Sequence, residues 1–301
     1  MKFGLKATIV LLSIFSACLV RAERLIESKV FLNQKVEVFG LAGTPWEDSF
    51  AFEEERSRAW MDALHHAYEA ILNLPLMEGK LVRQALQTNP ALKERLGMIL
   101  LSAPRTFYQP DTAGIVRCKL EVPLSGKLSL RSALYLAALR PQSQQPVSFL
   151  ASWTSALKDR QLPEPGFKRL IIDARDYYFE PSLFPRIFDN SGNLLFQEAM
   201  IPRPERFSRP AIRFAVEVKR ACANLKDDQI MIARASVNEL SSCDLTLAEP
   251  DATIVAGFCR LITLQPDKER EIVVLFDPEK TAPVGLIERS KTEKTATRAE
   301  K

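Results

Sequence analysis

Histidine is the scarcest chemistry-bearing residue in this chain, because only His65 and His66 occur among 301 residues. They are adjacent, so on a helix they point about 100° apart, whereas metal-binding helices place two histidines four residues apart. A Ser-His-Asp or Cys-His catalyst would have to use one of these two. We therefore expect surface histidines, no bound metal and no histidine-dependent catalyst.

Glycine is also sparse, and the 11 glycines form neither a P-loop nor the G-x-G-x-x-G dinucleotide fingerprint. The nucleophile elbow G-x-S-x-G is absent too. The sequence therefore predicts a non-enzymatic protein without a cofactor. An excess of one charge is lacking as well, because 41 basic residues face 37 acidic ones, which argues against nucleic acid as a partner.

The N-terminus has the features of a secretory signal peptide at residues 1–22. A basic start precedes the uncharged run 7–20, and the small or β-branched residues Val20 and Ala22 suit a signal peptidase. The run is too short to span a bilayer, which needs about 20 apolar residues, and no later run reaches that length. We expect export, with the mature chain beginning at Glu23.

A second form of processing stays open. The segment Phe15-Ser16-Ala17-Cys18 has the form of a lipobox, in which the cysteine becomes the lipid-modified N-terminus of a bacterial lipoprotein. Phe15 departs from the pattern, because Leu, Val or Ile is usual there. Lipidation at Cys18 would place the protein on a membrane, whereas cleavage after Ala22 would release it.

Cleavage would leave four of the five cysteines, at wide spacings and without a C-x-x-C motif, so zinc and thioredoxin-like sites are not indicated. Cys118 alternates with apolar residues and is expected to be a buried thiol. Cys222, Cys243 and Cys259 are close enough in sequence for one pair to form a disulfide in an exported protein. We name Cys222–Cys259 as that pair.

The pattern of elements predicts an α+β protein with two small helix-on-sheet domains joined by a Pro/Gln-rich linker. The first domain covers residues 23–139 and the linker covers residues 140–146. The elements expected in the first domain are a strand at 31–39, a long helix ending at Leu72, a helical stretch at 77–101 that breaks near Pro90, a hairpin at 105–124 and a helix at 128–139.

The second domain covers residues 147–277. Its expected elements are a helix at 150–157, a buried strand at 168–174, a hairpin at 186–197, a segment at 209–224 that fits helix or strand, strands at 229–237 and 271–276, and a short helix at 251–258. The tail at 278–301 is rich in Lys, Glu, Thr and Arg, and we expect it to be disordered.

The most site-like group follows an apolar strand in the second domain, where Asp173, Arg175 and Asp176 occur together. Such residues could bind a ligand or perform acid–base chemistry, but more often they form an ion pair that caps the strand. Tyr177 and Tyr178 follow directly, either as an aromatic binding surface or as packing beneath the hairpin. We expect a structural cluster, with a hydrolase that uses Asp173 and Asp176 as the enzymatic alternative.

Two parts of the chain resemble known families. Residues 52–74 (FEEERSRAWMDALHHAYEAILNL) and 115–124 (IVRCKLEVPL) resemble the small bacterial envelope lipoproteins that include the flagellar basal-disk lipoprotein. The second domain resembles a unit fused to them in longer exported proteins of diderm bacteria. Its motifs are a strand with D-A-R at 173–175, P-x-L-x-P at 181–185, D-x-x-G at 189–192, and the later stretches 230–233, 243–247 and 272–277. Asp176 departs from that pattern, which usually has glycine.

The resemblance implies a non-enzymatic exported protein with a structural or assembly role in the cell envelope, connected with the flagellum. It implies a location in the periplasm or at the outer-membrane periphery, with other envelope or flagellar proteins as partners. Membrane attachment would require lipidated Cys18. It supplies no catalytic residues. The alternative is a module that binds peptidoglycan or another glycan, with Trp153, Tyr177 and Tyr178 as stacking surfaces.

Overall fold

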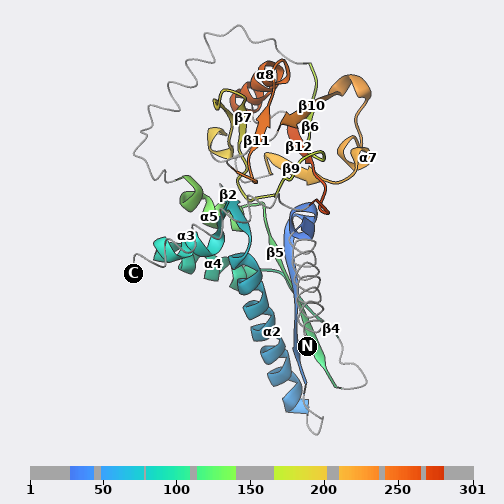
Figure 1. Cartoon of the computed structure of the whole chain (residues 1–301). Coiled ribbons are helices and arrows are strands. Elements are labelled where there is room, and N and C mark those ends of the chain that lie inside the picture. Colours follow the sequence, from blue (N-terminus) through green and yellow to red (C-terminus); the bar gives the residue numbers. More distant parts are fainter. Residues whose placement is uncertain are drawn as a thin grey trace, which may run out of the picture.

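The computed structural model describes residues 28–43, 49–77, 79–108, 114–139, 166–201, 210–236, 241–265 and 269–280. These residues form an α+β fold with two main sheets, which confirms the predicted fold class (Figure 1). Residues 1–22 with Cys18, the linker at 140–146, the predicted helix at 150–157 with Trp153, and the tail from 281 lie outside the described residues.

The first sheet is antiparallel and has the strand order β1-β5-β4. Its strands are β1 (Lys35–Ala42), β4 (Arg105–Tyr108) and β5 (Val116–Pro123). The predicted long helix is α2 (Ser49–Leu72), and it packs on one face of this sheet. Figure 1 shows α2 and the three strands extending together away from the second sheet, and we call this part the arm.

Small residues let α2 approach β1 closely. Ala59, Ala63 and Ala67 recur at each turn of the helix and are fully buried. Gly40 of β1 lies against them, and a Cβ atom at Gly40 would overlap the carbonyl oxygen of Ala59 and the backbone nitrogen of Ala63. Position 40 therefore requires glycine, because any side chain would push the helix away from the strand.

Trp60 lies at the edge of this packed face and is half-buried. Its ring is covered by Arg105 of β4, whose guanidinium carbon lies 4.1 Å from the ring centroid. Trp60 is therefore only partly buried against the sheet. The fully buried positions of α2 that face Gly40 are alanines, which allow the close approach that a tryptophan would prevent.

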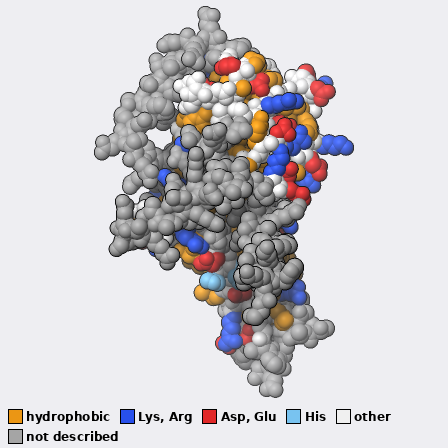
Figure 2. Space-filling view, viewed as in Figure 1, with side chains coloured by type: hydrophobic (Ala, Val, Ile, Leu, Met, Phe, Trp, Pro, Cys, Tyr) orange, Lys and Arg blue, Asp and Glu red, His pale blue; other side chains and the backbone are white. Residues whose placement is uncertain are grey.

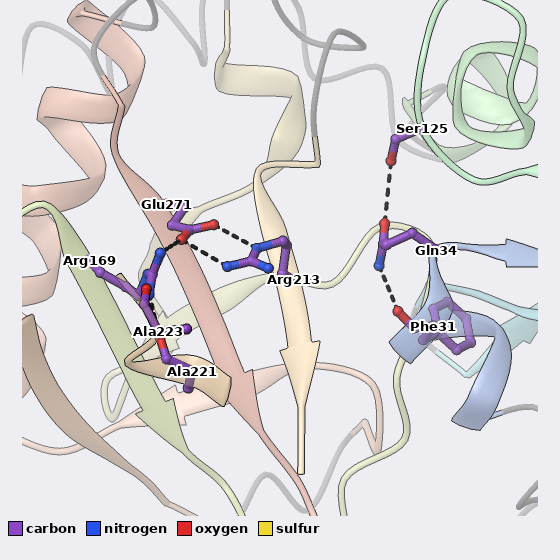
Figure 3. Close-up of polar contacts among 8 residues, drawn as sticks. All are labelled: Phe31, Gln34, Ser125, Arg169, Arg213, Ala221, Ala223 and Glu271. Carbon is purple, nitrogen blue, oxygen red and sulfur yellow. Dashed lines mark hydrogen bonds and ion pairs between the residues drawn. The ribbon is translucent and has the colours of Figure 1, made fainter. Parts of the chain in front are cut away.

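The predicted strand at 31–39 is wrong at its start, because residues 28–33 are helical and β1 begins at Lys35. Gln34 separates the two with a positive φ of 55°. Its side-chain nitrogen donates to the carbonyl of Phe31 at 2.6 Å (Figure 3). Its own backbone carbonyl accepts the Leu124 amide at 2.9 Å. These bonds fix the turn from which β1 enters the sheet.

The helical stretch of the first unit is broken where the sequence predicts it. The elements there are α3 (Val82–Thr88), α4 (Pro90–Ser102) and, after β5, α5 (Leu130–Leu139). Pro90 is the first residue of α4, where its missing N–H costs nothing. A small hairpin of β2 (Pro75–Met77) and β3 (Lys80–Leu81) was not predicted, because its strands are too short to show a pattern.

The second sheet has seven strands in the order β8-β7-β11-β10-β6-β12-β9. Strands β10, β6, β12 and β9 are mutually parallel, whereas β11 is antiparallel to β10 and β8 to β7. The strands are β6 (Arg169–Asp173), β7 (Ile187–Asp189), β8 (Leu194–Phe196), β9 (Ile212–Ala215), β10 (Ile230–Ser236), β11 (Leu245–Leu247) and β12 (Glu271–Leu275).

The helices of the second unit differ in length from those expected. Helix α8 (Asp251–Leu264) continues well past the predicted end at 258. The segment at 209–224, which fitted either helix or strand, contains both, as β9 is followed by α7 (Val218–Ala221). Short 3₁₀ turns occur at η1 (Glu198–Met200) and η3 (Asp227–Gln229).

The two units share one buried cluster rather than two separate cores. The P-x-L-x-P segment pairs with β2, because the amides of Leu183 and Phe184 donate to the carbonyls of Pro75 and Leu76, each at 3.0 Å. Tyr135 of α5 also contacts the ring of Phe184, with centroids 6.2 Å apart. The hairpin β2–β3 and α5 therefore hold the second sheet against the first unit.

A buried ion pair lies within this shared core. Arg131 of α5 and Glu198 of η1 expose 1% and 5% of their side chains, with Arg131 Nη1 3.7 Å from Glu198 Oε2. All three guanidinium nitrogens of Arg131 are buried without a hydrogen-bond partner. Because an arginine stays charged, its burial is tolerated only beside the carboxylate of Glu198.

We predict that Gly40→Ala destabilises the protein by about 1–3 kcal/mol, because the added methyl group forces α2 away from β1. Gly97→Ala in α4 is the matched control, since a Cβ there meets nothing within 4 Å. That change should stabilise the helix by about 0.5–1 kcal/mol. Urea unfolding followed by circular dichroism measures both. Equal effects at the two positions would mean that the close approach does not matter.

We predict that Glu198→Ala lowers the free energy of unfolding by about 3–5 kcal/mol, because it leaves the Arg131 charge buried without a counter-ion. The double variant Arg131→Met/Glu198→Leu should recover most of that loss, because it removes both charges. Urea unfolding of the two single variants and the double variant gives the coupling energy. A coupling near zero would show that the two side chains do not interact.

Candidate functional site

The predicted cluster in the second unit forms an ion pair at the carboxyl end of β6. Arg175 donates from Nε to Asp173 Oδ1 at 2.9 Å and from Nη2 to Oδ2 at 2.6 Å, and its backbone N–H donates to Oδ1 at 3.1 Å. The side-chain bonds from Arg175 are the main reason that the pKa of Asp173 lies below its ordinary value of 3.8, with burial opposing them. Both carboxylate oxygens are therefore occupied by the neighbouring arginine.

The other members of the cluster differ in their exposure. Asp176 is exposed, whereas Tyr177 and Tyr178 are half-buried. Tyr177 packs against the main buried cluster. The geometry brings Asp173 and Arg175 together as a bonded turn after β6, and it supports the structural interpretation better than an active site.

A second charged group, which the sequence analysis missed, lies at the other end of the parallel strands (Figure 3). Glu271 of β12 accepts from Arg213 of β9 at 2.6 and 2.9 Å and forms an ion pair with Arg169 of β6. Arg169 also donates to the carbonyls of Ala221 and Ala223 at 2.6 and 3.0 Å. The group thus ties three strands to the end of α7.

The two arginines offset the cost of burying the Glu271 carboxylate. Burial alone would raise the pKa of Glu271, but the hydrogen bonds and charges of Arg213 and Arg169 hold it below 4.5. The signal was present in the sequence as charged residues at the starts of strands. It could not be interpreted without knowing that β9, β12 and β6 are neighbours.

The expected disulfide between Cys222 and Cys259 is wrong, because all four cysteines in the described ranges are free thiols. Cys222 lies with Ile171 and Val273 on one face of the second sheet, whereas Cys259 of α8 is buried with Ile172 on the other face. Successive residues of a strand point to opposite faces, so the sheet itself separates the two sulfur atoms.

The buried thiols have no sign of reactivity. Cys118 is fully buried, as the alternation in its strand predicts. Burial raises the pKa of the thiols of Cys118, Cys243 and Cys259, so that they stay protonated at neutral pH. They act as small apolar side chains in the core.

A group of exposed apolar side chains lies on the arm, on the sheet face turned away from α2. Phe39 and Leu41 of β1 and Tyr108 of β4 are 46%, 53% and 44% exposed. The rings of Phe39 and Tyr108 meet across β5, with centroids 6.3 Å apart. A shallow cavity of about 400 Å³ is lined by Phe39, Leu41, Ile115 and Arg117. We call these five residues the arm patch.

The backbone beneath the arm patch is held by α2. The backbone N–H of Leu41 donates to Asp62 Oδ2 at 2.9 Å, and the carbonyl oxygen of Phe39 lies 2.9 Å from Nδ1 of His66. Gly40 lies between them, packed on the backbone of the same helix. The expected surface histidine His66 is thus exposed but bonded. This segment is fixed by the helix while its two apolar side chains face solvent.

A charged network borders the arm patch on the same sheet face. Lys35 and Lys119 pair with Glu37 and Glu121 across β1 and β5, and the Lys119 pairs are 3.2 and 3.0 Å long. The hydrogen bonds from Lys35 and Lys119 lower the pKa of Glu121 to about 2. Two positive and two negative charges balance, so the border is hydrophilic without a net charge.

Within the described ranges, no group of three or more His, Cys, Asp or Glu is placed to hold a metal ion. In the same part of the chain, no helix combines the length and the apolar character needed to cross a bilayer. Figure 2 shows acidic and basic side chains interspersed over the visible described surface of the second unit. Lipidation at Cys18 falls outside the described residues.

Comparison with known proteins gives one finding. Residues 169–261 match the family described as Treponema pallidum Tp0624, second domain. The match begins at β6 and ends within α8, so it covers most of the seven-stranded sheet but none of the arm. A search of curated proteins found no match.

We predict that Arg175→Ala costs about 1 kcal/mol or less at pH 7, because 41% of the Arg175 side chain is exposed and water screens the pair. Since the pair lowers the pKa of Asp173, its contribution is present above the ordinary aspartate pKa and is lost as the pH falls through the native-state value. Urea unfolding at pH 7 and pH 3 measures the difference between wild type and variant. A difference that stays unchanged at pH 3 would exclude the ion pair as its cause.

Proposed function

We propose that this protein is a non-enzymatic exported component of the bacterial cell envelope, with a structural or assembly role that is exercised through protein contacts and connected with the flagellum. The signal-like residues 1–22 support export to the periplasm or outer-membrane periphery of a diderm bacterium. The resemblance of residues 52–74 and 115–124 to envelope lipoproteins supports the flagellar connection. The match of residues 169–261 to a domain of a Treponema pallidum protein adds support for a bacterial source of this kind.

The arm patch is the observation that carries the proposal. Exposed apolar side chains are normal when they are scattered, but a contiguous group with polar borders is typical of a protein interface. Here Phe39 and Leu41 are presented by a backbone that α2 holds in place. A surface fixed before binding loses little conformational entropy when a partner docks, which favours a protein-contact role.

The glycan-binding alternative has less support among the described residues. Stacking on a sugar requires an open aromatic face, whereas Tyr177 packs against the core and Tyr178 is half-buried. The third residue of that interpretation, Trp153, lies outside the described residues. Retention of the protein on purified cell wall would reinstate this alternative.

We predict that deleting the gene reduces motility or alters flagellar structure, and that the wild-type gene restores both. The variant Phe39→Ser/Leu41→Ser should be exported at normal levels but should fail to restore them. The control Met98→Ser/Leu101→Ser changes two side chains of α4 that are 64% and 60% exposed, and it should restore motility. An unaffected deletion strain would rule out the flagellar role. Full rescue by the Phe39/Leu41 variant would rule out the arm patch as the contact surface.

A further inference from the structure

Strand β1 lies at an edge of the three-stranded sheet, with β5 as its single partner strand among the described elements. In an antiparallel pair, alternate residues turn their N–H and C=O groups away from the partner. The carbonyl of Gln34 accepts the amide of Leu124 next to β5, so the backbone N–H and C=O groups of the even-numbered residues of β1 point toward β5. The backbone N–H and C=O groups of the odd-numbered residues, which include Phe39 and Leu41, therefore point toward the open edge.

An open edge of this kind is a template for strand addition by another chain. An incoming strand would use the carbonyl of Phe39 and the amide of Leu41 together, because both groups face outward two residues apart. Both positions are already occupied by side chains of α2. Asp62 accepts from the Leu41 amide at 2.9 Å, and Nδ1 of His66 lies 2.9 Å from the Phe39 carbonyl oxygen, to which it can donate.

The spacing of residues along α2 fixes the position of these two side chains at the strand edge. Asp62 and His66 are one turn apart, with His66 Nε2 3.8 Å from Asp62 Oδ1, so each side chain helps to orient the other. Ala59 and Ala63 on the same side of the helix bring its backbone against Gly40. The helix can reach the edge of the strand with short side chains only because it lies so close.

We propose that Asp62 and His66 form a polar clamp that closes the edge of β1 against strand addition by a second copy of this chain. The second copy is the expected occupant because β1 is complementary to itself. Antiparallel pairing of two β1 strands centred on Gly40 sets Phe39 of one copy opposite Leu41 of the other, so the two exposed apolar side chains cover each other. The clamp leaves the side chains of the arm patch as the accessible contact surface and keeps its backbone from self-pairing.

The decisive variant is Asp62→Ala/His66→Ala in the full chain. Sedimentation velocity over a hundredfold range of concentration should show an association step for this variant that is absent from wild type. The control His65→Ala/Glu69→Ala also removes a histidine and an acid four residues apart on α2, both exposed and without a bond to β1. It should sediment like wild type.

Two further variants identify the cause. Leu41→Pro in the Asp62→Ala/His66→Ala background removes the amide that an added strand needs, and it should abolish the association step. The variant Asp62→Asn/His66→Gln retains an acceptor and a donor, so it should stay unassociated. Association that persists with Leu41→Pro would place the contact elsewhere and would overturn the proposal.

Hydrogen exchange of wild type provides a test that depends on no variant. The Leu41 amide should exchange at least tenfold more slowly than the outward-facing Glu37 amide of the same strand. Equal rates would show that Asp62 does not hold the Leu41 amide, and the proposal would fail. A natively folded Asp62→Ala/His66→Ala variant that sediments like wild type at every concentration would also overturn it.

Discussion

The close approach of α2 to β1 is the constraint on which the arm depends. Gly40 has no side chain, and the facing positions Ala59 and Ala63 carry only methyl groups, so the helix backbone comes within contact of the strand. At that distance, side chains as short as those of Asp62 and His66 reach the strand edge. The same contact therefore fixes the helix, satisfies two backbone groups and sets the position of the arm patch.

The rest of the molecule anchors this arm. The hairpin β2–β3 and α5 join the second sheet in one buried cluster, with the Arg131–Glu198 pair inside it. A buried ion pair adds little stability compared with well-packed hydrophobic side chains. Any other arrangement of the two units would leave the charges of Arg131 and Glu198 buried and unpaired, so the pair favours one arrangement. The match to a known domain covers most of the second sheet and none of the arm.

Local patterns predicted most elements, and contacts between distant segments could not be predicted. The alternation of Val116 and Cys118 identified β5, and Pro90 marked the break between α3 and α4. The disulfide prediction failed because sequence distance does not show that a sheet lies between Cys222 and Cys259. The arm patch was missed for a similar reason: an apolar residue such as Phe39 is expected to be buried until the sheet is known to lack a cover on that face.

The central claim is that the protein acts through the arm patch, and site-specific photo-crosslinking in living cells tests it most directly. The photoreactive residue p-benzoylphenylalanine would replace Phe39 in the arm patch or, as a control, Met98 on α4, which is 64% exposed. We predict a discrete adduct with another envelope protein at position 39 and none at position 98. No adduct at position 39, or the same adducts at both positions, would contradict the account.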